Sequence, residues 1–131
     1  MRILIAEDDL ASRKAIYTFL SKFGDCDMTV NGTEAVDAFL MALDDEMPYD
    51  LVCLDIMMPE MDGYQALKSI RDIERERGVE DDEGAKIIMT TALNESTNVN
   101  KAYDLGCVAY AAKPIDQAKF HNVMQMLDLI P

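Results

Sequence analysis

Residues 51–59, LVCLDIMMP, decide how the rest of the chain is interpreted. Seven of these nine residues are apolar, and the stretch ends at the chain-breaking Pro59, so it predicts a buried strand. Asp55 lies inside this apolar stretch, although a carboxylate is costly to bury without a partner or a metal ion. We infer that Asp55 stands at the open end of a sheet.

Four other short runs predict further strands on either side of this one. The expected strands are residues 2–6, 26–30, 50–54, 85–90 and 107–111, of which 26–30 is the weakest. Between them, apolar residues recur every three or four positions, which is typical of amphipathic helices. The expected helix faces lie within residues 15–23, 35–43, 66–73, 94–104 and 120–127, with Gly24 ending the first helix, Asn31-Gly32 turning the chain, and Asp62-Gly63 opening a turn or helix.

This alternation of strands and helices predicts an α/β doubly wound fold. Near-continuous apolar strands indicate a parallel sheet that is covered on both faces. Five strands fit the flavodoxin-like (βα)5 arrangement, with strand order 2-1-3-4-5. The length of 131 residues fits one domain, so we expect a single domain over residues 1–131.

Composition and charge exclude several classes of protein. The formal net charge of −13 opposes contact with nucleic acid or anionic lipid, and the acidic runs at 44–50 and 80–83 are typical of solvated loops. The apolar runs are too short to cross a bilayer, and no signal-peptide pattern is present, so we expect a cytoplasmic protein. The cysteines at 26, 53 and 107 lack metal-binding spacing and are expected to be reduced and buried, and the single His121 argues against zinc.

Charged and hydroxyl side chains follow four of the expected strands. Glu7 and Asp8 follow the first, Asp55 the third, Thr91 ends the fourth, and Lys113 follows the fifth. In open parallel sheets, functional sites form beyond the carboxyl ends of the strands. We therefore expect three acids, a hydroxyl and an ammonium to meet at one edge of the sheet.

The chemistry of this set points to a divalent cation and to phosphoryl transfer. Two carboxylates about 4 Å apart repel each other by roughly 4 kcal/mol at an effective dielectric constant of 20. Mg²⁺ is the natural guest of a site that has only oxygen ligands, and it leaves open positions for phosphate oxygens. Asp55 can then act as a nucleophile, while Lys113 and Thr91 can pair with phosphoryl oxygens.

Each of these residues also has a plain structural interpretation when it is taken alone. Glu7 and Asp8 can cap the first helix, Thr91 can simply end a strand, and Lys113 can be a surface lysine. Their joint placement at one edge favours the functional interpretation.

Four motifs carry a resemblance to a known family. ILIAEDD, LVCLDIMMPEMDG, IIMTTA and AYAAKP occur in this order, and the chain resembles the response-regulator receiver domains of the chemotaxis-regulator type from Arg2 to the last helix. The resemblance implies that Asp8 binds Mg²⁺ directly and that Glu7 acts mainly through water. It also implies that Asp55 is the phosphoacceptor and a second ligand. The further implied roles are the backbone carbonyl of Met57 as third ligand, Thr91 and Lys113 as switch hydroxyl and switch lysine, and Tyr110 as the aromatic residue that rotates inward.

The family also implies a function. A sensor histidine kinase phosphorylates Asp55, and the face formed by the fourth helix, fifth strand and fifth helix changes shape to control the binding of a downstream protein. The chain would then be a stand-alone receiver without an output domain, and no enzyme beyond its own phosphorylation and dephosphorylation. Met57 and Leu93 flank the expected path of water to the phosphoryl group and cannot activate water, so we expect slow self-dephosphorylation.

Three other functions are weighed against this one. A relay carrier would use the same pocket to pass the phosphoryl group to a histidine phosphotransfer domain. An aspartyl-phosphate phosphatase of the haloacid dehalogenase type needs a second acid where this chain has Met57. A flavin or nucleotide binder needs a loop rich in Gly, Ser and Thr where this chain has Glu7, Asp8 and Asp9.

Overall fold

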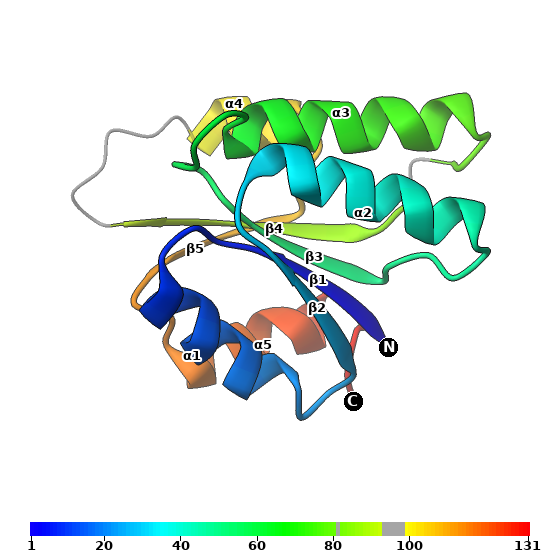
Figure 1. Cartoon of the computed structure of the whole chain (residues 1–131). Coiled ribbons are helices and arrows are strands. Elements are labelled where there is room, and N and C mark those ends of the chain that lie inside the picture. Colours follow the sequence, from blue (N-terminus) through cyan, green and yellow to red (C-terminus); the bar gives the residue numbers. More distant parts are fainter. Residues whose placement is uncertain (81, 93–98) are drawn as a thin grey trace.

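The computed structural model describes residues 1–80, 82–92 and 99–131 and shows one parallel five-stranded sheet with helices on both faces (Figure 1). The strand order is β2-β1-β3-β4-β5, and every neighbouring pair is parallel. The predicted flavodoxin-like fold is therefore confirmed. The elements are β1 Arg2–Ala6, α1 Leu10–Leu20, β2 Asp25–Thr29, α2 Gly32–Asp44, β3 Leu51–Asp55, α3 Gly63–Glu76, β4 Lys86–Ala92, α4 Val99–Asp104, β5 Ala109–Lys113 and α5 Gln117–Met126.

The sheet separates two hydrophobic cores. Helices α1 and α5 cover one face, and α2, α3 and α4 cover the other (Figure 1). Alternate residues of β3 supply both cores: Leu51 and Cys53 pack on the α1–α5 side, whereas Val52 and Leu54 pack on the opposite side. Because both faces of this central strand are buried, its sequence is apolar from Leu51 to Leu54, and only its last residue, Asp55, is charged.

Several element boundaries differ from the predictions for local reasons. Helix α1 ends at Leu20 rather than at Gly24, and Phe23 packs edge-on against Phe19 beyond the helix end, with 5.4 Å between ring centroids. The chain bends at Val30 and Asn31, and Asn31 also caps α2, since its side chain accepts a hydrogen bond of 2.8 Å from the amide of Glu34.

The fifth strand and the first helix cap also need correction. Strand β5 spans Ala109–Lys113, two residues later than predicted, so Lys113 is its last residue. The N-cap of α1 is Asp9, whose carboxylate accepts from the amide of Ser12 at 2.8 Å, and neither Glu7 nor Asp8 takes that role. The carboxylates of the acidic pair therefore do not serve as this cap.

The predicted burial of the three cysteines is confirmed only in part. Cys53 and Cys107 are buried free thiols, as predicted, whereas Cys26 is only half-buried.

No helix in the described ranges is long and apolar enough to cross a membrane. Of the predicted helix at 94–104, only Val99–Asp104 falls within the described residues, and Leu93 also lies outside them.

Candidate functional site

The carboxylates of Glu7, Asp8 and Asp55 form one cluster at the carboxyl edge of the sheet. Glu7 and Asp8 follow β1, and Asp55 ends the neighbouring strand β3. One ligand oxygen from each residue lies within 4.8 Å of the other two. Glu7 and Asp55 are buried, with 0% and 1% of their surface exposed, whereas Asp8 is exposed. The structure thus brings together the three acids that the strand order predicted.

Lys113 reaches this cluster from the end of β5. Its Nζ lies 3.1 Å from Oε1 of Glu7 and 3.1 Å from Oδ1 of Asp55. The lysine side chain is only 15% exposed, so the ion pairs form largely out of water. One ammonium is therefore shared between two buried carboxylates, and a third carboxylate stands beside them.

Burial and crowding change the protonation of the site. Burial, followed by the hydrogen bond and the negative charge of Glu7, raises the pKa of Asp55 to about 8, although the charge of Lys113 acts in the opposite direction. For Lys113, burial lowers the pKa, but its hydrogen bond to Glu7 and the charges of Asp55 and Glu7 outweigh that effect, so the pKa is raised overall. The lysine stays charged, and the cluster still carries more negative than positive charge.

This donor set fits a hard divalent cation. All of its side-chain ligands are carboxylate oxygens, and their mutual spacing allows them to share one ion. Burial, and after it the neighbouring Glu7, disfavours the ionised form of Asp55, and the charge of Lys113 does not offset these effects. Glu7, Asp8 and Asp55 can therefore hold Mg²⁺, and a cation would favour the ionised form of Asp55.

The loop after β3 is held closely against the site. Asp62 and Gln65 form a capping box that begins α3, and the amide of Gly63 donates to the carbonyl of Ile56 at 2.8 Å. A Cβ atom at Gly63 would clash with the backbone carbonyl oxygen of Asp55, so glycine allows this close approach. The same loop carries Met57, whose side chain is 54% exposed.

Thr91 and Tyr110 lie on the two strands beyond β3. Thr91 is buried one residue before the end of β4, and its hydroxyl donates to the carbonyl of Ala92 at 3.3 Å. Tyr110 is half-buried in β5, opposite Met89, and packs against the core on the α2–α3–α4 side. Thr91 directly follows Thr90, the register partner of Asp55, and Tyr110 lies on β5 three residues before Lys113, while their switch roles stay predictions.

Comparison with known proteins identifies the family. The family model for the response regulator receiver domain matches residues 3–125. The chain belongs to this family. This receiver domain is accordingly a module of two-component signalling, and receiver domains typically use Mg²⁺.

Relatives and solved structures agree with this assignment. The chemotaxis protein CheY of Treponema pallidum is 34% identical over 120 residues, which cover 90% of this chain and 76% of that protein. A crystal structure of the CheX–CheY–BeF3–Mg²⁺ complex from Borrelia burgdorferi matches with a TM-score of 0.79 and 28% identity, covering 96% of this chain and 88% of the other.

A second structural match contains a phosphotransfer protein. The complex of the Saccharomyces cerevisiae histidine phosphotransfer protein Ypd1 with the receiver domain of Ssk1 matches with a TM-score of 0.77 and 27% identity, covering 95% of this chain and 90% of the other. The chain spans about half the length, or less, of most of the curated relatives that it matches.

Two groups of contacts in the receiver domain were not predicted from the sequence. Nη1 of Arg13 donates to the carbonyl of Glu7 at 2.9 Å, and Arg71 forms a buried ion pair of 2.7 Å with Glu74. Arg71 also donates to the carbonyl of Gly106, 35 residues away, at 2.7 and 3.0 Å. The spacing of apolar residues in a sequence does not predict contacts of this kind. An arginine in the first turn after an acidic pair is the signal that could have drawn attention to Arg13.

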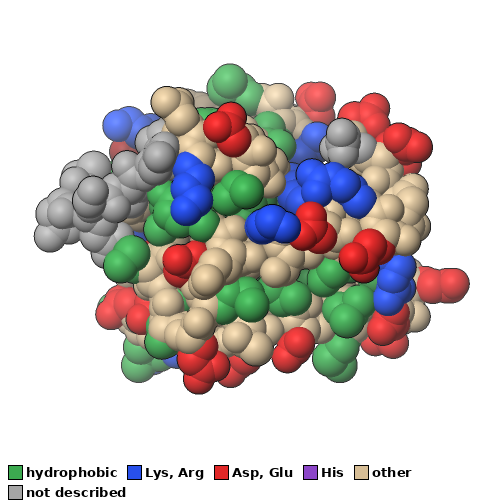
Figure 2. All heavy atoms as spheres, turned by 90° about the horizontal axis from the view of Figure 1, so that it is seen from above, with side chains coloured by type: hydrophobic (Ala, Val, Ile, Leu, Met, Phe, Trp, Pro, Cys, Tyr) green, Lys and Arg blue, Asp and Glu red, His purple; other side chains and the backbone are tan. Residues whose placement is uncertain are grey.

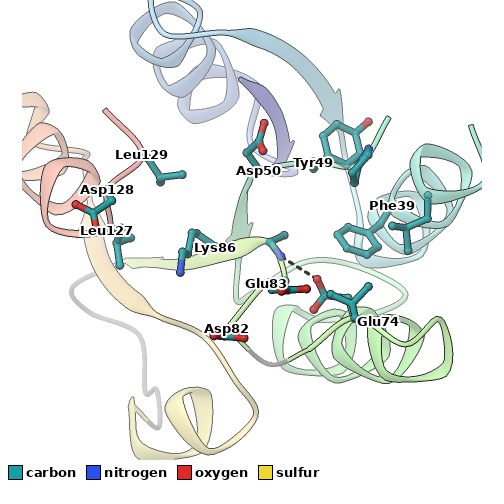
Figure 3. Close-up of a pocket in the computed structure, with 15 residues that line it drawn as sticks. Phe39, Tyr49, Asp50, Glu74, Asp82, Glu83, Lys86, Leu127, Asp128 and Leu129 are labelled. Atoms are coloured by element: carbon teal, nitrogen blue, oxygen red, sulfur yellow. Dashed lines mark hydrogen bonds between the residues drawn. The ribbon is translucent and has the colours of Figure 1, made fainter. Parts of the chain in front are cut away.

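The opposite edge of the receiver domain holds a separate cavity. Its volume is 420 Å³, and it is lined by the strand-entry loops, the end of α3 and the segment after α5 (Figure 3). Glu74 reaches into this region and accepts a hydrogen bond of 2.8 Å from the amide of Ala85. None of the predicted site residues lines this cavity, so it plays no part in the site at the carboxyl edge.

Basic side chains gather over the helical face of α2, α3 and α4, seen from above in Figure 2. They alternate there with acidic side chains. On α3, Asp72 pairs with Lys68 at 2.7 Å and with Arg75 at 3.0 Å, and Arg77 pairs with Asp44 of α2 at 2.7 Å. These pairs neutralise much of the basic charge on this face.

Proposed function

We propose that this chain is a response regulator receiver that accepts a phosphoryl group on Asp55 from a sensor histidine kinase. The observation that carries the proposal is a buried carboxylate at the end of β3, with Lys113 3.1 Å away and two further acids beside it. In the transfer, the nitrogen–phosphorus bond of a phosphohistidine breaks and a bond forms between phosphorus and an Asp55 oxygen. The histidine nitrogen then takes up a proton.

The residues of the cluster divide this chemistry among them. Asp55 supplies the nucleophilic oxygen, while Glu7, Asp8, Asp55 and the backbone carbonyl of Met57 are the proposed ligands of Mg²⁺. When bound, Mg²⁺ offsets the negative charge of the phosphoryl oxygens. The ammonium of Lys113 would move from Asp55 to one of those oxygens.

Phosphorylation would be communicated through β4 and β5. A phosphoryl group adds negative charge and acceptor oxygens, and the Thr91 hydroxyl can turn toward it. We propose that Tyr110 then moves inward and that the α4–β5–α5 face shifts between two states, which controls the binding of a downstream protein. Tyr110 lies at the core boundary, half-buried and with its hydroxyl oxygen already buried, so the proposed movement would bury the exposed part of its ring.

Acting as a relay carrier is a second candidate function. Its support is the similarity to the receiver domain of Ssk1, which was solved together with the phosphotransfer protein Ypd1. Loading Asp55 with labelled phosphate and offering a histidine phosphotransfer domain separates the two functions. Loss of label to the histidine indicates a relay, whereas retention together with target binding indicates an output role.

The proposal extends to the organisation of the chain. We propose one receiver domain over residues 1–131 that acts in signalling and catalyses only its own phosphorylation and dephosphorylation. The three free thiols suit the reducing conditions of the cytoplasm, where we propose that it acts.

The deciding experiment is incubation with Mg²⁺ and acetyl phosphate, followed by intact mass measurement. We expect the mass of one added phosphoryl group in the parent chain and none in Asp55→Asn. An unchanged mass in the parent, or an equal gain in the variant, would refute the proposal. Asp72→Asn is a matched control, because it removes an exposed carboxylate on α3 and should leave phosphorylation unchanged.

A further inference from the structure

Arg13 contacts the backbone of both members of the acidic pair. Its Nη1 donates to the carbonyl oxygen of Glu7 at 2.9 Å and lies 3.4 Å from the carbonyl oxygen of Asp8. Arg13 belongs to the first turn of α1, and its amide donates to the carbonyl of Asp9 at 2.9 Å. The guanidinium therefore joins a rigid helix to the short loop that carries two of the cluster's carboxylates.

The two acids differ in how the fold holds them. The amide of Glu7 donates to the carbonyl of Thr29 at 3.1 Å, and its buried carboxylate accepts from Lys113 at 3.1 Å. The Asp8 carboxylate is exposed, and it has no hydrogen-bond donor among residues 1–80, 82–92 and 99–131. Asp8 is thus oriented through its backbone, and Arg13 contacts that backbone on the side of the helix.

We propose that Arg13 is a positioning residue of the cation site, which holds the β1–α1 loop so that the Asp8 carboxylate faces Glu7 and Asp55. This inference rests on the proposed Mg²⁺ site. A loop that is already ordered does not lose conformational freedom when the ion binds, so its ordering improves affinity. Groups that orient metal ligands typically change metal affinity by about 10–100-fold when they are removed.

Charge and positioning predict opposite effects of removing Arg13. The guanidinium is positive and repels a divalent cation, so loss of its charge alone should tighten Mg²⁺ binding. Loss of its hydrogen bonds frees the loop and should weaken binding. The direction of the change in affinity therefore separates a positioning role from a purely electrostatic one.

The test measures the dissociation constant for Mg²⁺ of the unphosphorylated full chain by titration calorimetry. The variants are Arg13→Met, which removes both charge and donors, and Arg13→Lys, which keeps the charge but loses the guanidinium fork. Lys14→Met is the control, because Lys14 is an exposed cation one residue further along the helix. Urea unfolding in the presence of EDTA gives the stability of each ion-free variant separately.

We expect Arg13→Met to weaken Mg²⁺ binding by about tenfold, Arg13→Lys to weaken it by a smaller factor, and Lys14→Met to leave it unchanged or slightly tighter. Equal or tighter binding by Arg13→Met would overturn the inference, whatever its effect on unfolding. If Arg13→Met does not fold, Arg13→Lys decides by the same criterion. A parent chain that does not bind Mg²⁺ would overturn the proposed function as well, whereas a binding parent with unaffected variants overturns the inference alone.

Discussion

Replacing Asp55 by Asn should stabilise the ion-free chain at neutral pH, although it removes the proposed phosphoacceptor. Asn has nearly the same shape, and its carbonyl can accept from Lys113 while its amide donates to Glu7. The variant therefore keeps both contacts of the buried position and has no carboxyl group to titrate. Because the pKa of Asp55 is raised to about 8, the parent must take up a proton when it folds at neutral pH, which costs free energy, whereas Asn needs no proton, so the variant should favour the folded state.

The magnitude follows from the raised pKa of Asp55, which burial and the neighbouring Glu7 shift from 3.8 to about 8. The folded state holds its proton more tightly than the unfolded state does, so the contribution to stability is complete below pH 3.8 and is lost as the pH rises through about 8. At 1.36 kcal/mol for each pKa unit, the loss at pH 7 is at most about 4 kcal/mol. Local relaxation and water entry reduce this figure, so we expect Asp55→Asn to gain about 2 kcal/mol.

Urea unfolding followed by circular dichroism in EDTA, near pH 5 and near pH 7.5, tests this prediction. The gain from Asp55→Asn should be larger near pH 7.5, because the parent has lost more stability there. Added Mg²⁺ should stabilise the parent and have little effect on the variant. Asp72→Asn is the control, because the hydrogen bond from Lys68 lowers the pKa of that exposed carboxyl and its removal should bring no gain. A variant that is no more stable than the parent near pH 7.5, or whose gain is equal at both pH values, contradicts the reasoning.

Three further predictions follow from the same contacts. Lys113→Met leaves two buried carboxylates without their cation, so the free energy of unfolding measured in urea should fall by about 3 kcal/mol near pH 7.5. The loss of stability should be smaller near pH 5. Arg71→Met should lower the free energy of unfolding by about 3 kcal/mol in the same assay, because Arg71 pairs with a buried carboxylate. Arg75→Met, at a side chain that is 61% exposed, should lower it by under about 1 kcal/mol. Equal losses in the two variants would contradict the difference in burial between the two ion pairs. Met57→Asn places a group that can orient water beside the acyl phosphate, so hydrolysis followed by intact mass should be about fivefold faster, and an unchanged or slower rate counts against a blocking role for Met57.

Most of the fold could be predicted because the central strands are buried on both faces. A strand such as β3 is then apolar up to its carboxyl end, and the helices between strands show a single apolar stripe. The site could be predicted for a related reason, since parallel strands bring their carboxyl ends to one edge whatever the details of packing. Glu7, Asp55 and Lys113 meet from distant parts of the sequence because of that topology.

Features that depend on individual contacts could not be predicted in this way. The small residues of β5, AYAAK, do not mark where the strand begins, so the predicted start lies two residues before the observed one. The choice of Asp9 rather than Asp8 as helix cap depends on the conformation of a few backbone bonds. The hydrogen bond from Arg71 to Gly106 joins residues 35 positions apart, and no periodic pattern in the sequence predicts it.

Charge balance distinguishes the two buried ionic groups in the part of the chain that the structure describes, of which we propose that only the one at the carboxyl edge is a functional site. At the opposite edge, Glu74 faces one arginine, and its second oxygen accepts from the amide of Ala85, so each of its oxygens has a donor. Such a group stabilises the junction between α3 and β4 and has no need of a further cation. At the carboxyl edge, a single ammonium faces three carboxylates, and burial together with the hydrogen bond and negative charge of Glu7 keeps the pKa of Asp55 high. A divalent cation corrects that imbalance and leaves an ionised nucleophile, which is the state that phosphoryl transfer requires.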